Sequence, residues 1–224
     1  MFDFLESGRY DVLGAFWVTV QLTFYSAIGS LIWGTVLAAM RVSPVPLMRG
    51  FGTAYVNVVR NTPLTVIILA ASLGLFQTLG ATLAGGDFEE INFRLAVLGL
   101  AAYHATFVCE ALRSGVNTVP VGQAEAARAM GLSFFQVLTL IVLPQAFRSV
   151  VAPLTNVLIA LTKNTTVAAA IGVSEAALLM KEMIENESDA IFLVSAMFAF
   201  GFIVLTLPTG LLFGWVSKRV AVKR

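Results

Sequence analysis

Charged residues are the first thing this sequence lacks. Only 12% of its 224 residues are Asp, Glu, Lys or Arg, while 58% are apolar. A soluble domain of this length carries roughly 25% charged residues, so the deficit points to a lipid bilayer. The net charge of +1 offers no basic surface of the kind that binds nucleic acid. Nucleic acid is therefore excluded as a partner, and membrane lipid is expected around the chain.

Reactive and metal-binding side chains are also scarce. One cysteine, Cys109, cannot form an internal disulfide or a cysteine metal cluster, and one histidine, His104, cannot build a histidine metal site alone. The chain has no Gly-x-x-x-x-Gly-Lys-Ser/Thr loop that would hold nucleotide phosphates. We therefore expect no metal site, no cofactor bound by this chain and no enzymatic activity of its own.

Long apolar runs are what the chain does have. A membrane-spanning helix needs about 20 apolar residues, and five segments meet this requirement. The second is interrupted at Arg60-Asn61-Thr62-Pro63, and the first is long enough to predict tilt. We expect an all-α membrane protein forming a single transmembrane domain over residues 1–224. Its five predicted spans cover about residues 12–40, 52–79, 93–112, 137–171 and 190–216.

The charges on the connecting segments predict how the spans are oriented. Basic residues mark cytoplasmic links, and here they lie after the first and third spans and in the tail, whereas acidic residues gather in the alternate links. With five spans, this puts the N-terminus outside and the C-terminus in the cytoplasm. The basic set is Arg41, Arg49, Arg113, Arg128, Lys218, Arg219, Lys223 and Arg224; the acidic set is Asp87, Glu89, Glu90, Glu175, Glu182, Glu185, Glu187 and Asp189.

The cytoplasmic link at about residues 120–143 predicts two short helices joined at a glycine. Pro120 is suited to a helix start, and Gly131 can adopt the left-handed conformation that ends a helix. Ser133 with Gln136 three residues later is a capping-box pattern for a second helix. The small side chains of Ala126 and Ala127 keep the first helix thin, so a groove on another protein could close around it.

This link resembles a known family. Its pattern is similar to the EAA loop of importer permeases of the ATP-binding-cassette class. The pattern is Glu125-Ala126-Ala127, then three residues, Gly131, then nine residues and Ile141-Val142-Leu143-Pro144. The resemblance implies the type I importer permease fold, with coupling helices that dock on an ATPase. It assigns ATPase coupling to Glu125, Ala126, Ala127, Gly131 and Leu132. Without the family, an ordinary helix–glycine–helix connector would explain the same residues.

The likeness extends along most of the chain. Arg60-Asn61-Thr62-Pro63 is similar to the Arg-Gly-Thr-Pro signature of polar amino-acid permeases, with Asn61 in place of glycine, so the local turn could differ. Glu110 to Gly115 resembles the segment that leads into the loop. Leu161 to Thr166 resembles a Leu-Lys-Asp-Ser/Thr segment, with Asn164 in place of aspartate. Bacterial glutamate uptake permeases are the nearest likeness.

The resemblance also implies a set of partners. These are an ATPase dimer that carries the ATP and Mg, a second permease (a paralogue in preference to an identical copy) and an external substrate-binding protein. It places the chain in the bacterial inner membrane as a multi-pass protein.

Basic residues within the spans are candidate pathway residues, because an ionisable group there needs a partner or a wet cavity. Arg60 and Lys163 lie beside polar residues and helix-breaking positions, where unwound backbone can line such a cavity. The candidate substrate pathway therefore comprises Arg60, Asn61, Thr62, Lys163, Asn164, Thr165 and Thr166. Snorkelling to lipid headgroups is the alternative for Arg60 and, along with a structural ion pair, for Lys163.

Three further residues have structural readings that compete with functional ones. Glu110 and Arg113 are spaced to pair along one helix, which we favour over a gate. His104 is favoured as a hydrogen-bonded histidine of the bundle over a proton relay.

Two function classes stay open at this point. The permease reading is favoured, and a secondary amino-acid transporter driven by an ion gradient is the alternative. That alternative needs carboxylates within the membrane, and the middle of the predicted spans contains no Asp or Glu. The same absence argues against a cationic substrate, so glutamate is expected first and arginine, lysine and histidine last.

Overall fold

The computed structural model describes residues 9–83 and 85–220, which form a bundle of helices without strands in those ranges. Four long helical stretches meet the requirements of a membrane span, and the count reaches five if the bent pair Pro46–Arg60 and Leu64–Thr78 forms one span, which agrees with the all-α fold class. Lys223 and Arg224 lie outside the described residues. The elements are α2 (Val12–Val42), α3 (Pro46–Arg60), α4 (Leu64–Leu69), η1 (Ala70–Thr78), α5 (Phe88–Asn117), α6 (Val121–Ala129), α7 (Phe134–Val137), η2 (Leu138–Val142), α8 (Leu143–Asn164), η3 (Thr165–Ile171), α9 (Ala176–Asn186), η4 (Ser188–Ala190) and α10 (Ile191–Val220).

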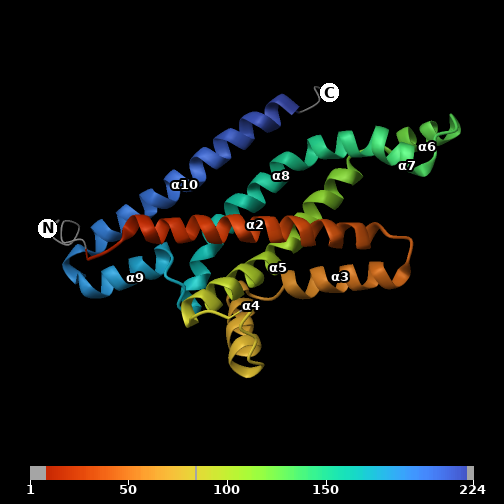
Figure 1. Ribbon diagram of the computed structural model, residues 1–224. Helices are drawn as coiled ribbons and strands as arrows, with labels where there is room; N and C mark the ends of the chain where they lie inside the picture. Colours follow the sequence, from red (N-terminus) through yellow and green to blue (C-terminus); the bar gives the residue numbers. More distant parts are fainter. Residues whose placement is uncertain (1–8, 84, 221–224) are drawn as a thin grey trace.

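The centre of the bundle is the crossing of α2 and α5 (Figure 1). Gly34 permits this close approach, because a Cβ built there would lie 2.8 Å from the Ala105 carbonyl oxygen and 2.6 Å from the Val108 Cβ atom. Helices pack this closely only where one side chain is very small. A core cluster at the crossing contains Leu37, Ala38, Val56, Ala105 and Cys109, and a second core cluster contains Leu22, Leu64, Ile68, Ala96, Leu100, Leu161, Ala168, Ile171 and Val173.

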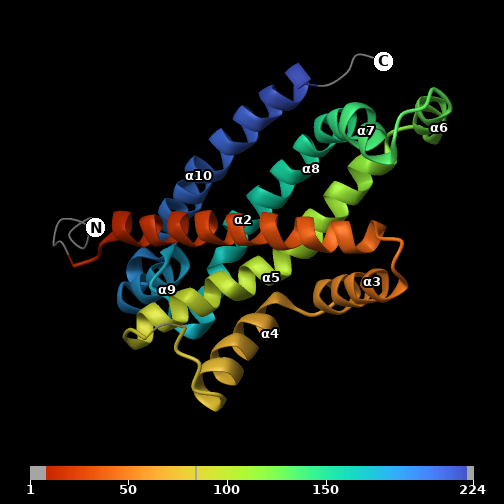
Figure 2. The same cartoon turned by 45° about the vertical axis from the view of Figure 1, so that its right-hand side comes forward.

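The second predicted span differs from a straight helix. It begins at Pro46, six residues earlier than predicted, and is bent by 105° between α3 and the α4–η1 segment (Figure 2). Pro63 provides the physical reason, because it lacks a backbone N–H and disfavours helical conformation in the residue before it. The predicted interruption at residues 60–63 is confirmed, and its sharpness is new information.

The acidic link before the last span was predicted only as an external connection, but it contains a helix. Glu175 caps the N-terminus of α9, accepting hydrogen bonds at Oε1 from the amides of Ala177 (2.9 Å) and Leu178 (3.0 Å). The side chain of Glu175 is fully buried, so it differs from the exposed acidic residues of the same link. Charge alone could not reveal this, because an N-cap and a solvated link both favour acidic residues.

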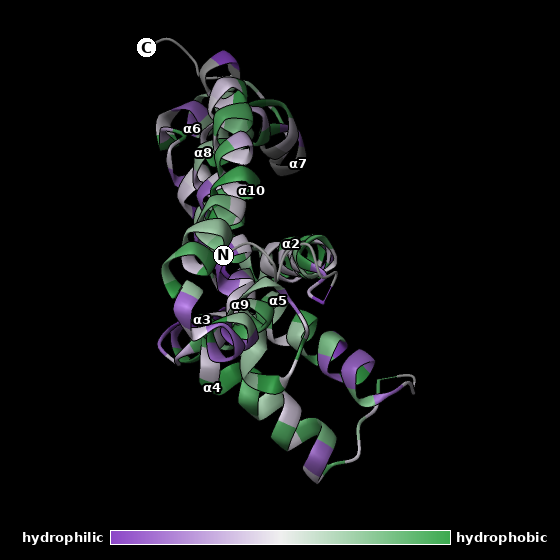
Figure 3. Cartoon of the chain, turned by 90° about the vertical axis from the view of Figure 1, so that its left-hand side faces the viewer, coloured by the Kyte–Doolittle hydropathy of each residue, from purple (hydrophilic) through white to green (hydrophobic). Residues whose placement is uncertain are grey.

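The helices differ in how polar their side chains are. Figure 3 shows hydrophobic residues along α10 and hydrophilic residues on α6. The candidate span that contains α10 has only 11% of its most apolar window buried, so this helix presents apolar side chains outward, as a lipid-facing helix does. The α6–α7 segment lies at one end of the bundle (Figure 1). The α9 helix lies close to the start of α2, far from the α6–α7 segment.

Candidate functional site

The link predicted to hold the coupling helices has the expected local structure. Gly131 adopts φ +90°, and the amides of Gly131 and Leu132 donate to the carbonyls of Arg128 (2.9 Å) and Ala127 (3.2 Å). These two bonds make the Schellman arrangement that ends α6. After the turn, the Ser133 amide donates to Gln136 Oε1 (2.8 Å) and the Gln136 amide donates to Ser133 Oγ (3.3 Å). Both sequence predictions, the glycine turn and the capping box, are confirmed.

The residues of this link divide into an outward face and a buried contact. Glu125, Ala126 and Gly131 are exposed, Leu132 is partly buried, and Ala127 is only 2% exposed. Met130 adds a large apolar side chain that is 76% exposed at the same tip. An exposed thin helix with an apolar tip is a surface suited to docking in a groove of another protein.

A hydrogen bond between side chains connects α6 of the coupling link to α8. Gln145 on α8 donates through Nε2 to Gln123 Oε1 on α6 at 2.7 Å. Nearby, Thr118 donates to Ser149 Oγ (3.1 Å), and Ser149 also approaches the Gly115 carbonyl (3.3 Å). A displacement of α6 would therefore reach α8, whose other end carries Lys163 and Asn164.

The first helix break carries three of the predicted pathway residues. Asn61 ends α3 with φ −90° and ψ 0°, a conformation that does not require glycine, so its substitution for the family's glycine leaves the turn unstrained. Its Nδ2 donates to the Asn57 carbonyl (2.7 Å), and Thr62 Oγ1 donates to the Val58 carbonyl (2.8 Å). The Arg60 guanidinium lies over the ring of Phe107, with 5.8 Å between its Cζ and the ring centroid. Arg60 thus turns toward α5.

The second helix break carries the other four. At Asn164 the α-helix α8 tightens into the 3-10 helix η3. Thr165 is buried and donates to the Thr162 carbonyl (2.8 Å), and Thr166 donates to the Lys163 carbonyl (2.8 Å). The side chain of Lys163 is exposed, whereas Asn164 Nδ2 lies 3.1 Å from Nε2 of His104 on α5. Successive helical residues point about 100° apart, so Lys163 and Asn164 address different surroundings.

The structure brings these two breaks together. The α4 helix, which follows the first break, packs against η3, which follows the second. Between the breaks lie Phe107 and His104, whose ring centroids are 6.1 Å apart. Arg60, Phe107, His104 and Asn164 therefore follow one another in contact near the midpoint of α5, and we call them the break cluster. Phe107 was missed at the sequence level, because nothing in the pattern separates it from the other phenylalanines of the spans.

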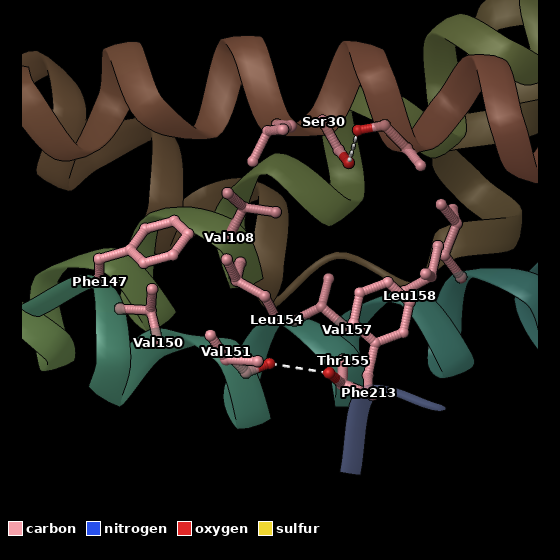
Figure 4. Close-up of a pocket in the computed structure, with 13 residues that line it drawn as sticks. Ser30, Val108, Phe147, Val150, Val151, Leu154, Thr155, Val157, Leu158 and Phe213 are labelled. Carbon is pink, nitrogen blue, oxygen red and sulfur yellow. Dashed lines mark hydrogen bonds between the residues drawn. The ribbon is translucent and has the colours of Figure 1, made fainter. Parts of the chain in front are cut away.

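An apolar cavity of about 270 Å³ lies apart from the break cluster, between α2, α5, α8 and Phe213 of α10. Figure 4 shows its two hydroxyl groups bonded to their own helices: Ser30 donates to the Ala27 carbonyl (3.0 Å) and Thr155 to the Val151 carbonyl (2.8 Å). With those groups satisfied, the cavity offers nothing that would recognise a charged amino acid. Val157, seven residues before Asn164 at the end of α8, lines this cavity.

A three-residue ion cluster joins α2 to α5 on the side of the coupling link. Glu110 pairs with Arg113 at 3.4 Å, which confirms the predicted pair along α5. It also pairs with Arg41 of α2 at 2.5 Å, a partner that sequence spacing could not reveal. The Arg41 side chain is 10% exposed and that of Glu110 is 28% exposed, so this partly buried pair joins the two helix ends.

Comparisons with known proteins agree with this architecture. The glutamate transport system permease proteins GluC of Corynebacterium efficiens and of Corynebacterium glutamicum are each 58% identical to this chain over 218 residues, covering 96% of this chain and 96% of the relative. The glutamate/aspartate import permease protein GltK of Escherichia coli is 29% identical, covering 91% of each chain. A crystal structure of an amino acid ABC transporter with histidines superposes with a TM-score of 0.82 at 25% identity, covering 93% of each chain.

The family profile described as the binding-protein-dependent transport system inner membrane component matches residues 15–222. Nothing in these comparisons supports a secondary transporter. Members of the family are translocation subunits that work with a separate ATPase and a substrate-binding protein, so this chain is not itself an enzyme. The chain, a multi-pass membrane permease of an ATP-binding-cassette importer, belongs to the binding-protein-dependent transport system inner membrane components.

Proposed function

We propose that this permease moves an acidic amino acid, glutamate in the first place, into the cytoplasm past the break cluster. The observation that carries the proposal is the charge of the candidate pathway residues: Arg60 and Lys163 are basic, and none of the segments that form the candidate spans has an acidic residue near its middle. An anion in a low-dielectric path needs a compensating cation. Two relatives at 58% identity are glutamate transport permeases, which supports the same substrate.

The assembly follows from the same proposal. A second permease, a paralogue in preference to an identical copy, would complete the path. Two ATPase subunits would bind ATP and Mg and dock on Glu125, Ala126, Ala127, Gly131 and Leu132. The C-terminus and α6 would face the cytoplasm, and the N-terminus and α9 would face the external binding protein, in the inner membrane of a bacterium.

Energy coupling would use the connection already described. When the ATPases close, α6 would move, and the bond between Gln123 and Gln145 would pass that movement to α8. The far end of α8 carries Asn164, at the contact with His104. The α8 helix of 22 residues, which contains Pro153, would thus link the docking surface to the path.

The substrate is tested by uptake of labelled amino acids into vesicles containing the assembled importer, with unlabelled competitors. We expect glutamate uptake that excess aspartate and glutamine reduce and that excess arginine leaves unchanged. Arginine uptake that excess glutamate does not diminish would refute the acidic substrate. Co-purification of the tagged chain identifies the second permease.

The two basic residues are tested separately from the substrate. Arg60→Met and Lys163→Met retain side-chain length and remove the charge, and each is expected to lower glutamate uptake about tenfold, because a desolvated ion contact contributes roughly 1.5–3 kcal/mol. Arg49→Met, which removes an exposed charge from the same helix as Arg60, is the matched control. Normal uptake by both variants would leave the substrate standing and remove these residues from the path.

A further inference from the structure

His104 occupies a central place in the break cluster without a role in the proposed charge selection. Its side chain is 1% exposed, on α5 midway between the two helix breaks. Tyr103 packs edge-on against the ring at 5.3 Å between centroids, and Phe107 lies on another side at 6.1 Å. A ring held in this way has a fixed orientation, so its two nitrogen atoms address fixed partners.

The partners decide which nitrogen carries the proton. Nδ1 lies 2.9 Å from the Leu100 carbonyl oxygen, which can only accept a hydrogen bond. Nδ1 must therefore donate and carry the proton. In the neutral imidazole, Nε2 then has only a lone pair. The Asn164 Nδ2 group, 3.1 Å away, is the donor that matches it.

This bond orients the Asn164 amide. Because its NH2 group faces His104, its oxygen Oδ1 faces elsewhere, since the two atoms diverge by about 120° at the amide carbon. Among the described residues, Oδ1 accepts no hydrogen bond, and it is not one of the fully buried polar atoms. The second helix break thus presents an unengaged amide oxygen, which is a hydrogen-bond acceptor suited to an ammonium group.

We propose that His104 is a positioning residue: the lone pair of its Nε2 holds the Asn164 amide so that Oδ1 receives the α-ammonium group of the transported amino acid. This inference rests on the proposed function, in which Arg60 or Lys163 faces a carboxylate group of the substrate. The Asn164 amide oxygen then supplies the other half of a site for a zwitterion. The histidine does not contact the substrate. It prevents the amide from turning its NH2 group toward the ammonium, where donor would meet donor.

The first test replaces the acceptor at position 104. His104→Gln retains an amide oxygen that can accept from Asn164, whereas His104→Leu retains bulk without an acceptor. We expect glutamate uptake by the assembled importer to fall about tenfold for His104→Leu and to stay within about threefold of wild type for His104→Gln. Uptake is normalised to the amount of permease reconstituted. Equal uptake by His104→Leu and wild type would overturn the proposal.

The second test changes position 164 and has a readout that simple packing would not move. In Asn164→Asp the carboxylate can only accept, so it faces the lone pair of His104 Nε2 as a second acceptor. The contact is restored when this pair of acceptors gains a proton, either on His104 Nε2 or on the new carboxyl group, and the ratio of variant to wild-type uptake should therefore rise severalfold from pH 8 to pH 6. In the double variant Asn164→Asp/His104→Gln, the glutamine can turn its NH2 group to the carboxylate, and the ratio should be flat.

The outcomes separate this proposal from the proposed function. If the wild-type importer takes up no glutamate, the substrate assignment fails, and the same variants are compared on the amino acid that it does take up. An Asn164→Asp ratio that does not change between pH 8 and pH 6, or that changes equally in the double variant, refutes the positioning role whichever amino acid is used.

Discussion

Raising the pH above 4.5 is expected to destabilise the folded permease through one carboxyl group, Glu175. This residue lies in the link between the last two spans, outside the membrane-spanning segments. Burial raises the pKa of Glu175 from its ordinary 4.5 to about 7, against the smaller opposing effects of the Ala177 and Leu178 amides and of the nearby Thr19 hydroxyl. Its second oxygen, Oε2, is buried and accepts no hydrogen bond from the described residues.

The sign and size of the effect follow from this shift. Below pH 4.5 the carboxyl is protonated in both the folded and the unfolded chain, so its full contribution to stability is present. Between pH 4.5 and about 7 the folded chain holds a proton that the unfolded chain releases, and stability falls as the pH rises. At about 1.4 kcal/mol for each pH unit, the loss is on the order of 3 kcal/mol.

The assay is thermal unfolding of the purified chain in detergent between pH 4.5 and pH 8. Glu175→Gln keeps an oxygen that can cap α9 and cannot ionise, so it should remove this pH dependence and unfold at a higher temperature than wild type at pH 8. Each kcal/mol of stability shifts the unfolding temperature by roughly 2–4 °C, so the unfolding temperatures of Glu175→Gln and wild type at pH 8 should differ by about 10 °C. Glu182→Gln, an exposed change on the same helix, should behave as wild type does. Parallel profiles for wild type and Glu175→Gln would refute the reasoning.

Three other predictions test the glycines and the orientation. Gly131→Val should abolish uptake while the chain still reaches the membrane, because a β-branched residue is strained at φ +90°. The control Gly122→Val, which also has open space around its Cβ position, should retain uptake. Normal uptake by Gly131→Val would remove the docking role from this turn. Gly34→Ala should destabilise the chain by about 1–3 kcal/mol in thermal unfolding, because the added Cβ atom would clash with the backbone of α5. Gly50→Ala, whose added Cβ atom has open space around it, is the control. Equal stability of the two variants would contradict the close crossing. In a Cys109→Ser background, an impermeant thiol reagent added outside should label Glu89→Cys and spare Arg219→Cys; the reverse pattern would invert the proposed topology.

Much of this molecule could be predicted from local sequence. Apolar runs of sufficient length predict membrane helices, because a bilayer demands that each segment satisfy its own backbone hydrogen bonds. The turn at Gly131 and the capping box of Ser133 and Gln136 were predictable for a similar reason, since each involves residues within a few positions of one another. The break at Pro63 belongs to the same class.

What the sequence alone could not determine is which distant residues meet. The Arg41–Glu110 pair joins residues 69 positions apart, and the His104–Asn164 contact joins residues 60 apart. Helical spacing predicts neighbours three or four positions away, so it found Arg113 for Glu110 and could not find Arg41. The burial of Glu175 has the same origin, because an acidic residue in an acidic link looks solvated until α2 and α9 pack around it. Local physics therefore determined the main helices, the break at Pro63 and the docking turn. Only the packing of α2, α5 and α8 decided the ion cluster and the partners of the histidine, and only the packing of α2 and α9 decided the buried acid.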